Sequence, residues 1–165
     1  MRLLFSAIFL LNFFLAEAQT QNGAFNLTLK ALLSHSVKEV TVPDAIKSTA
    51  LFVDARERNE YDVSHVKNAL FVGYDNFNFD SLASINKGQK IIVYCSVGYR
   101  SEKVAEKLVT AGFTDVSNLV GGIFEWVNQG YAVVDSSGAT TQNIHAYNKT
   151  WGIWLNKGNK VYNPK

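Results

Sequence analysis

Residues 90–101 read KIIVYCSVGYRS, and this stretch gives the strongest indication of the fold. Residues 90–94 form a largely apolar run, a pattern typical of a strand that is buried on both faces. A short loop containing Gly98 follows, and residues 101–111 then place their apolar side chains on one helical stripe. A buried strand that passes through a short loop into a helix is the building unit of an α/β domain.

The same alternation extends in both directions from this stretch. Apolar runs predict further strands at residues 50–53 and 69–72, and short strands are also predicted at residues 39–42 and 115–119. Helical patterns stand beside them, around residues 44–47 behind Pro43 and directly after Gly121 and Gly122. We therefore predict an α/β domain with a mainly parallel sheet of about five strands, flanked by helices.

The first eighteen residues differ from the rest of the chain. Arg2 precedes an apolar run over residues 3–15, and Ala16-Glu17-Ala18 is a small-x-small cleavage pattern. This run is too short to span a bilayer, which needs about twenty residues. Residues 1–18 are therefore predicted to be a secretory signal peptide that is cleaved after Ala18. We expect a protein exported to the periplasm or secreted, with no membrane attachment after cleavage.

Three segments are predicted after the cleavage point. Residues 19–37 form an N-terminal helical extension, with a leucine-rich helix over residues 26–36. Residues 38–135 form the α/β domain, and residues 136–165 form a C-terminal helical extension. In this extension an apolar stripe at helical spacing runs over residues 144–155 and includes Trp151 and Trp154. The stripe either binds a partner or covers the core, and the second interpretation is favoured.

The composition excludes several classes of function. Hydrophobic residues make up 47% of the 165 residues, which is enough for a packed core. The 16 basic and 14 acidic residues form no block of like charge, so nucleic-acid binding is not expected. Cys95 is the single cysteine, and the three histidines lie far apart in the sequence. We expect no metal site and no cofactor, and we expect a monomer.

Cys95 is the residue best placed for chemistry. It ends a strand on a loop that leads into a helix N-terminus, where free N–H groups and the helix dipole favour a thiolate over a thiol. Arg100 adds a positive charge, and Gly98 lets the chain turn so that the amides converge on the sulfur. The alternative is an inert core cysteine, but such a residue does not require glycine and arginine close behind it. We expect an ionised, solvent-reachable sulfur surrounded by main-chain donors.

Asp54 and Arg56 stand at the end of a neighbouring strand, at the sheet edge where sites form. One alternative is that they shape the mouth of the substrate site. The other is that they support the loop, with Arg56 paired to Glu57 or Glu60. Support is favoured, because partly buried ion pairs of this kind are common in scaffolds.

Several motifs resemble the rhodanese family of sulfurtransferases, in the order that this family shows and over residues 40–134. They are residues 51–57 (LFVDARE), 95–101 (CSVGYRS) and 119–126 (LVGGIFEW). Ser64 and Lys67-Asn68 depart from the family's usual turn. The resemblance implies a rhodanese-like fold for residues 38–135 and a structural role for His65.

The resemblance also implies a double displacement. The Cys95 thiolate attacks the outer sulfur of a donor such as thiosulfate, sulfite leaves, and a persulfide remains until a small thiol or a partner protein accepts the sulfur. Arg100 is expected to hold the anionic donor, and Ser101 to cap the helix or assist the cradle. The residues expected to bind the donor and the persulfide are Ser96, Val97, Gly98, Tyr99, Arg100 and Ser101, with Asp54 and Arg56 in support.

Two rival functions stay open. Four residues separate Cys95 from Arg100, whereas related phosphatases use a loop one residue longer. The tighter ring has less room for a phosphoryl group, so a cysteine phosphatase or arsenate reductase is disfavoured. The other rival is a catalytically silent rhodanese-like module that binds a partner, although Cys95 and Arg100 are both intact.

Overall fold

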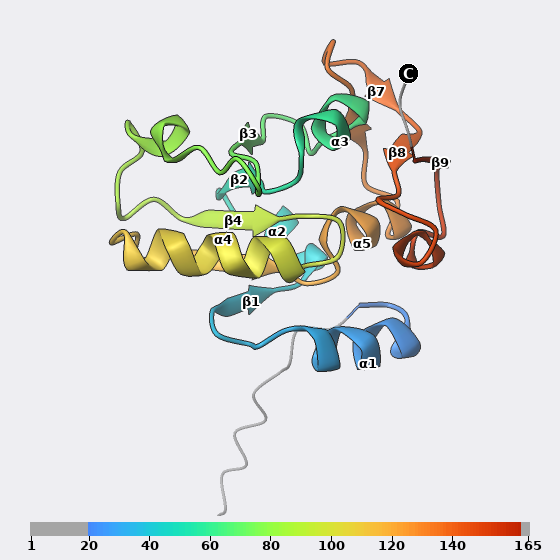
Figure 1. Ribbon diagram of the computed structural model, residues 1–165, viewed down its shortest axis with the longest axis horizontal. Coiled ribbons are helices and arrows are strands. Elements are labelled where there is room, and N and C mark those ends of the chain that lie inside the picture. Colours follow the sequence, from blue (N-terminus) through green and yellow to red (C-terminus); the bar gives the residue numbers. More distant parts are fainter. Residues whose placement is uncertain (1–19, 163–165) are drawn as a thin grey trace, which may run out of the picture.

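The computed structural model of the chain describes residues 20–162 (Figure 1). The predicted signal peptide, with its cleavage point after Ala18, lies outside the described residues. Within residues 20–162, no helix has both the length and the apolar character that a membrane crossing requires.

A five-stranded parallel sheet forms the centre of the fold, as predicted from the apolar runs. Its order is β1-β5-β4-β2-β3, and every pair of neighbouring strands is parallel. All strands therefore end at one edge, where Cys95 follows the central strand. The strands are β1 (Lys38–Val40), β2 (Leu51–Asp54), β3 (Leu70–Phe71), β4 (Ile91–Tyr94) and β5 (Val116–Leu119).

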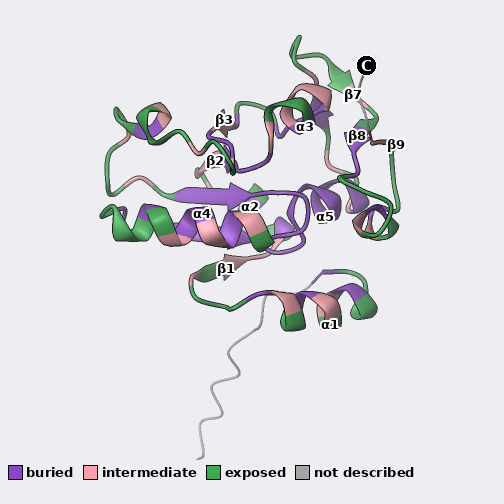
Figure 2. Cartoon of the chain, viewed as in Figure 1, coloured by how far each residue is buried: buried purple, intermediate pink, exposed green. Residues whose placement is uncertain are grey.

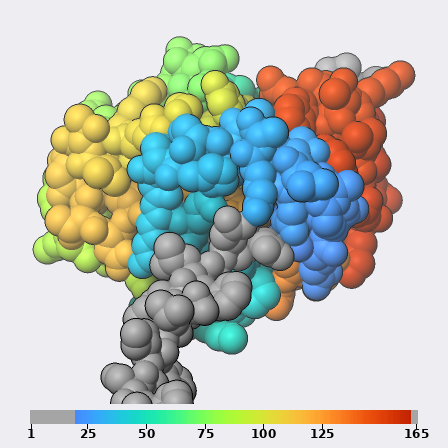
Figure 3. Space-filling view, turned by 90° about the horizontal axis from the view of Figure 1, so that it is seen from below, coloured from blue at the N-terminus to red at the C-terminus, as the bar shows by residue number. Residues whose placement is uncertain are grey.

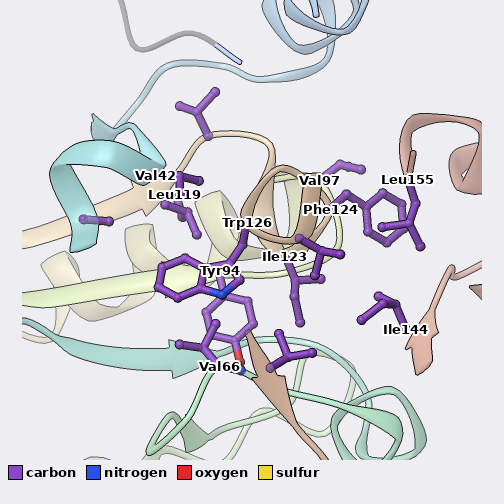
Figure 4. Packing of buried hydrophobic residues seen from close by; sticks show 14 of the residues in the cluster. Val42, Val66, Tyr94, Val97, Leu119, Ile123, Phe124, Trp126, Ile144 and Leu155 are labelled. Atoms are coloured by element: carbon purple, nitrogen blue, oxygen red, sulfur yellow. Dashed lines mark hydrogen bonds between the residues drawn. The ribbon is translucent and has the colours of Figure 1, made fainter. Parts of the chain in front are cut away.

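Alternate residues of β4 enter two separate hydrophobic clusters, one on each face of the sheet. Ile92 and Tyr94 pack on the face covered by α5 (Gly122–Asn128) and α2 (Val42–Ile46) (Figure 4). Ile91 and Val93 pack on the opposite face, against α4 (Tyr99–Thr110). This alternation is the two-residue period of a strand, and it makes all four residues of β4 buried (Figure 2).

Two short helices were not predicted from the sequence. The first, α3 (Arg58–Val63), begins at Glu57, where a capping box joins Glu57 and Glu60. The second is the 3-10 helix η1 (Phe79–Leu82). The short α3 matters most for the site, because it carries Glu60 in a buried position.

The N-terminal extension contains one helix, α1 (Gly23–Leu32), as predicted but shifted toward the N-terminus. It starts earlier than expected because the Asn22 side chain accepts hydrogen bonds from the N–H groups of Ala24 and Phe25. The helix buries Phe25 and Leu29 against the main core.

The helix predicted over residues 144–155 is wrong. The C-terminal segment, residues 133–162, instead forms four short strands and a 3-10 helix. They are β6 (Val133–Val134), β7 (Thr140–Thr141), β8 (Asn143–His145), the 3-10 helix η2 (Trp151–Trp154) and β9 (Asn159–Val161). Tyr147 adopts a left-handed φ of 60°, which a helix cannot include, and Asn148 accepts a hydrogen bond from the Trp151 N–H to start η2. The apolar stripe nevertheless covers core, as favoured, because Ile144 and Leu155 are buried.

The two extensions meet on the same side of the domain. Figure 3 shows α1 in blue beside the C-terminal segment in red. The rings of Phe25 and Trp154 stack with centroids 5.0 Å apart. Asn128 of α5 donates a 2.8 Å hydrogen bond to the Trp154 carbonyl, which fixes η2 to the domain.

Gly122, the first residue of α5, lies against the loop that follows β4. Its φ is +54°, and a Cβ at this position would come within 2.3 Å of the Cys95 carbonyl oxygen and 2.8 Å of the Ser96 carbonyl carbon. These neighbours are backbone atoms, so no side-chain rotation can relieve the overlap.

We therefore expect Gly122→Ala to lower the free energy of unfolding by more than about 3 kcal/mol, from the left-handed backbone and the overlap together. Gly138→Ala is the matched control, because Gly138 has a φ of +83° and nothing within 4 Å of the new Cβ. It should lose only about 1 kcal/mol, from the backbone alone. Urea unfolding of both variants measures the difference, and equal losses would contradict a close approach at Gly122.

Candidate active site

Cys95 lies on the wall of a cavity of about 260 Å³ at the carboxyl edge of the sheet. The residue is only 1% exposed, so the expectation of an open, solvent-reachable sulfur is wrong. The structure differs because residues outside the central domain also close around the loop. The cavity is lined by Leu32, Cys95, Ser96, Val97, Tyr99, Arg100, Tyr147 and Trp151.

The sulfur is held by the start of α4. The Gly98 N–H donates a hydrogen bond to Cys95 Sγ over 3.1 Å. Gly98 is the N-cap of this twelve-residue helix and has a φ of +127°, a conformation that favours glycine. The positive end of the helix dipole therefore lies at the sulfur, where it favours negative charge.

The carbonyl groups of the same loop are bonded away from the sulfur. The Cys95 carbonyl accepts from the Ile123 N–H (2.9 Å), and the Ser96 carbonyl accepts from the Phe124 N–H (3.2 Å). Both donors belong to the first turn of α5, which would otherwise leave these N–H groups without partners. The loop is thus fixed between the N-termini of two helices.

Asn118 on β5 supports the loop through two hydrogen bonds of its side chain. Its Nδ2 donates to the Gly98 carbonyl over 3.0 Å, and its Oδ1 lies 2.7 Å from the Ser101 hydroxyl. Both Asn118 and Ser101 are fully buried. The helix cap is therefore Gly98 and not Ser101, and the Ser101 side chain is part of the loop's support.

Arg100 is engaged by Glu60 of α3 in a bidentate ion pair. Its NH1 and NH2 groups donate to the two carboxylate oxygens over 2.6 and 2.8 Å, and NH2 also donates to Ser96 Oγ over 3.0 Å. Burial alone would raise the pKa of Glu60, but the hydrogen bonds and charge of Arg100 hold it at about 2. Burial likewise opposes the charge of Arg100, yet its pKa is raised by Glu60. Both groups are therefore charged at neutral pH.

Tyr147 from the C-terminal segment covers the guanidinium. The Arg100 carbon CZ lies 4.9 Å from the centre of the Tyr147 ring, a cation–π contact. The left-handed backbone of Tyr147 is stabilised by its N–H, which donates to His145 Nδ1 over 3.2 Å. Burial lowers the pKa of His145, so this imidazole is neutral beside Glu60.

Asp54 and Arg56 form a fully buried ion pair that does not line the cavity. Arg56 NH2 lies 2.6 Å from Asp54 Oδ2 and also donates to the Ser64 carbonyl over 2.6 Å. The scaffold interpretation agrees with this geometry, but the expected partner, Glu57 or Glu60, is wrong. Asp54 lies closer because it stands two residues away across the end of β2, so the Arg56 side chain folds back onto it.

His65 also lies outside the cavity lining. Its ring stacks on Tyr61 with centroids 3.8 Å apart, and Nδ1 lies 3.0 Å from the Tyr61 carbonyl. Among residues 20–162, no three histidine, cysteine or acidic side chains come together as potential metal ligands.

Several residues of the site were not identified as functional from the sequence. Glu60 was considered only as a partner for Arg56, and its capping-box position three residues after Glu57 was a signal that it belongs to a helix. The others carry no local signal, because their positions depend on tertiary packing. They are Leu32, Asn118, Tyr147 and Trp151.

Comparisons with known proteins agree with this geometry. A family model described as a rhodanese-like domain matches residues 38–129. The BH2092 protein from Bacillus halodurans has a crystal structure that superposes with a TM-score of 0.55 at 27% identity, covering 70% of this chain and 86% of that chain. A thiosulfate sulfurtransferase from Pseudomonas aeruginosa gives a TM-score of 0.51 at 20% identity, covering 63% of this chain and 21% of that chain, a likeness of fold alone.

Among curated proteins, a tRNA uridine(34) hydroxylase from Hamiltonella defensa is 38% identical over 117 residues, which cover 67% of this chain and 31% of that protein. The chain thus spans less than a third of the length of this relative. The rhodanese-like model, by contrast, takes in more than half of the chain and includes the whole loop from Cys95 to Arg100. By this match, and by its five-stranded sheet, the chain belongs to the rhodanese-like domain family.

Proposed function

We propose that this protein is a sulfurtransferase that moves a sulfane sulfur from a donor such as thiosulfate to a thiol acceptor through a persulfide on Cys95. The observation that carries the proposal is the position of Cys95 Sγ, which accepts the Gly98 N–H at the start of α4 and lies in a cavity shared with Arg100. Such an environment stabilises an anionic sulfur nucleophile and the anionic persulfide that follows.

The reaction has two displacements. In the first, the Cys95 thiolate attacks the outer sulfur of thiosulfate, the sulfur–sulfur bond of the donor breaks, and sulfite leaves with the bonding electrons. In the second, an acceptor thiolate attacks the terminal sulfur of the persulfide and Cys95 is released as a thiolate. The Gly98 N–H and the α4 dipole stabilise the negative sulfur in both steps.

Arg100 is the cation available to the donor. A guanidinium has five N–H donors, and three of them are bonded to Glu60 and Ser96 within the described part of the chain. The remaining two make no hydrogen bond among residues 20–162, and we propose that they contact a donor oxygen, because Arg100 lines the cavity. Glu60 and Ser96 act here as positioning residues, because they set the plane of the guanidinium.

Hydroxylation of tRNA is not part of this proposal. The chain spans only 31% of the hydroxylase that it resembles. Its 16 basic and 14 acidic residues also leave a formal net charge of only +2, which attracts an RNA backbone weakly. A small-molecule donor and a thiol acceptor fit the enclosed cavity better, and we propose that the protein acts as a monomer.

Replacement of Cys95 by serine tests the central claim. The wild-type protein, incubated with thiosulfate, should gain the mass of one sulfur atom and should form thiocyanate when cyanide is added. Cys95→Ser should lose both, with a rate at least about a thousandfold lower, because serine cannot carry the persulfide. The readouts are intact-protein mass spectrometry and a colorimetric thiocyanate assay.

Absence of thiocyanate and of the mass gain in the wild type would overturn the proposal and would favour a silent binding module. Turnover of an aryl phosphate or of arsenate would instead favour the phosphatase or reductase alternative. Neither activity is expected from a loop with four residues between Cys95 and Arg100.

The ion pair that orients Arg100 should make stability depend on pH. The pKa of Glu60 is about 2 in the folded protein, below its ordinary value of 4.5, so the ionised carboxylate stabilises the fold. This contribution is complete above pH 4.5 and is lost as the pH falls toward 2. Glu60→Gln should therefore cost about 3 kcal/mol at pH 7, and the difference from wild type should shrink by about 2 kcal/mol at pH 3.

Urea unfolding of wild type and Glu60→Gln at both pH values measures this effect. Glu106→Gln is the control, because Glu106 also forms an ion pair, with Lys103 (2.7 Å), but on the surface of α4, where ion pairs contribute little. A Glu60→Gln deficit that is equally large at pH 3 and pH 7 would show that the ionised pair is not what stabilises the fold.

We also propose that the protein is exported, with removal of residues 1–18. Expression of the full-length chain in a bacterial host should then yield a periplasmic or secreted protein whose first residue is Gln19, as read by N-terminal sequencing. Replacing Ala16 and Ala18 with bulky residues should block processing, since the cleavage pattern needs small side chains. A full-length protein recovered from the cytoplasmic fraction would exclude export.

A further inference from the structure

Three of the eight residues that line the Cys95 cavity come from outside the segment that matches the family model. That segment ends at residue 129 and begins at residue 38. Leu32 is contributed by α1, and Tyr147 and Trp151 by the C-terminal segment. The family domain thus supplies the reactive sulfur and part of the walls, and the two extensions add three large side chains to the enclosure.

These walls are held in place by specific contacts. The Phe25 and Trp154 rings stack at an interplanar angle of 12°, which joins α1 to η2. Glu125 of α5 accepts a 2.8 Å hydrogen bond from the Gln21 N–H, which ties the start of the N-terminal extension to the domain. The enclosure is therefore formed before any ligand enters, which reduces the entropic cost of binding.

Apart from Arg100, which serves the donor, the walls of the cavity offer no positive charge to the body of an acceptor. The charge of Arg100 is compensated by the two oxygens of Glu60, and one face of its guanidinium is covered by Tyr147. Leu32, Val97, Tyr99 and Trp151, which also line the cavity, carry no positive charge to balance a carboxylate. A neutral, apolar group loses little on entering such a space and gains from leaving water.

The size of the cavity sets a further limit. Its volume of about 260 Å³ lies just below the range of roughly 300–1,000 Å³ that holds drug-sized ligands. An aromatic ring or a short alkyl chain fits, with its thiol directed at Cys95, whereas a folded protein partner cannot enter.

We infer that the sulfur acceptor is a small organic thiol with a neutral aromatic or alkyl body, which binds between Leu32, Tyr147 and Trp151. This inference rests on the proposed function and names the substrate of its second half-reaction. The acceptor enters as RSH and loses its proton to solvent. The thiolate then forms a bond to the terminal sulfur, the Cys95 sulfur–sulfur bond breaks, and the products are RSS⁻ and the Cys95 thiolate, with no net oxidation.

The test uses the full chain after its persulfide has been loaded with thiosulfate and confirmed by mass. Three probes remove the sulfur in parallel reactions: benzyl mercaptan (neutral and aromatic), 2-mercaptoethanol (neutral and polar) and 3-mercaptopropionate (anionic). Rates are corrected for the thiolate fraction and nucleophilicity of each probe. Benzyl mercaptan should react at least about tenfold faster than 3-mercaptopropionate, with 2-mercaptoethanol between them.

Variants connect this preference to the enclosure. Trp151→Ala should lower the benzyl mercaptan rate at least about fivefold more than it lowers the rate with cyanide, which is too small to need the walls. Trp151→Phe keeps an aromatic wall and should retain most of the preference. Ile153→Ala is the matched control, because Ile153 lies in the same 3-10 helix but is 60% exposed and does not line the cavity.

The outcomes separate this inference from the proposed function. Thiocyanate formation together with equal corrected rates for the three thiols would overturn the inference and leave the sulfurtransferase intact. Faster reaction of 3-mercaptopropionate would also overturn it. Failure to load the persulfide or to form thiocyanate would overturn the proposed function itself. The comparison of the three thiols with the wild-type protein tests the inference even where Trp151→Ala does not fold.

Discussion

The site depends on one constraint, the fixation of the loop after β4 between the N-termini of α4 and α5. The N–H groups of α5 bond the carbonyls of Cys95 and Ser96, and the N–H of Gly98 at the start of α4 bonds the sulfur. Each helix start has donors that need partners, and the loop accepts two N–H groups of α5 and the Gly98 N–H at the start of α4. Its carbonyls therefore turn toward α5, and the sulfur is left with a donor and a positive dipole end. Gly122 permits this arrangement because any side chain there would occupy the space of the loop's backbone.

A second layer of interactions keeps Arg100 in a defined place. Glu60 reaches the guanidinium from α3, and His145 lies 3.9 Å from Glu60 on the C-terminal segment. His145 is neutral because burial lowers its pKa, so it adds no competing positive charge near Glu60. Three elements that are distant in sequence thus determine the orientation and net charge of one cation. This compensated charge distinguishes the cavity from an open anion-binding site.

The fold and the loop were largely predictable from sequence because both depend on local patterns. The apolar runs at residues 50–53 and 90–94 identify buried strands, and glycine behind Cys95 identifies the turn into α4. The C-terminal segment was mispredicted for a physical reason. Spacings of three and four residues between apolar side chains fit a helix. The same spacings also occur here in short strands and a 3-10 helix, which are joined through the left-handed backbone of Tyr147. Asn118 and Leu32 could not be assigned to the site, since neither contact is local in sequence.

The extensions help to enclose Cys95 at the carboxyl edge of the sheet, where parallel α/β folds form their sites. In an open parallel α/β sheet, ligands bind in the crevice outside the carboxyl ends of the strands. Here α1 and η2 pack against each other through Phe25 and Trp154, and together they place apolar side chains over the crevice. The chemistry of the sulfur then follows from the domain, whereas the choice of what reaches it follows from the extensions. Relatives that share the loop from Cys95 to Arg100 but lack these segments have no physical reason to share the same acceptor.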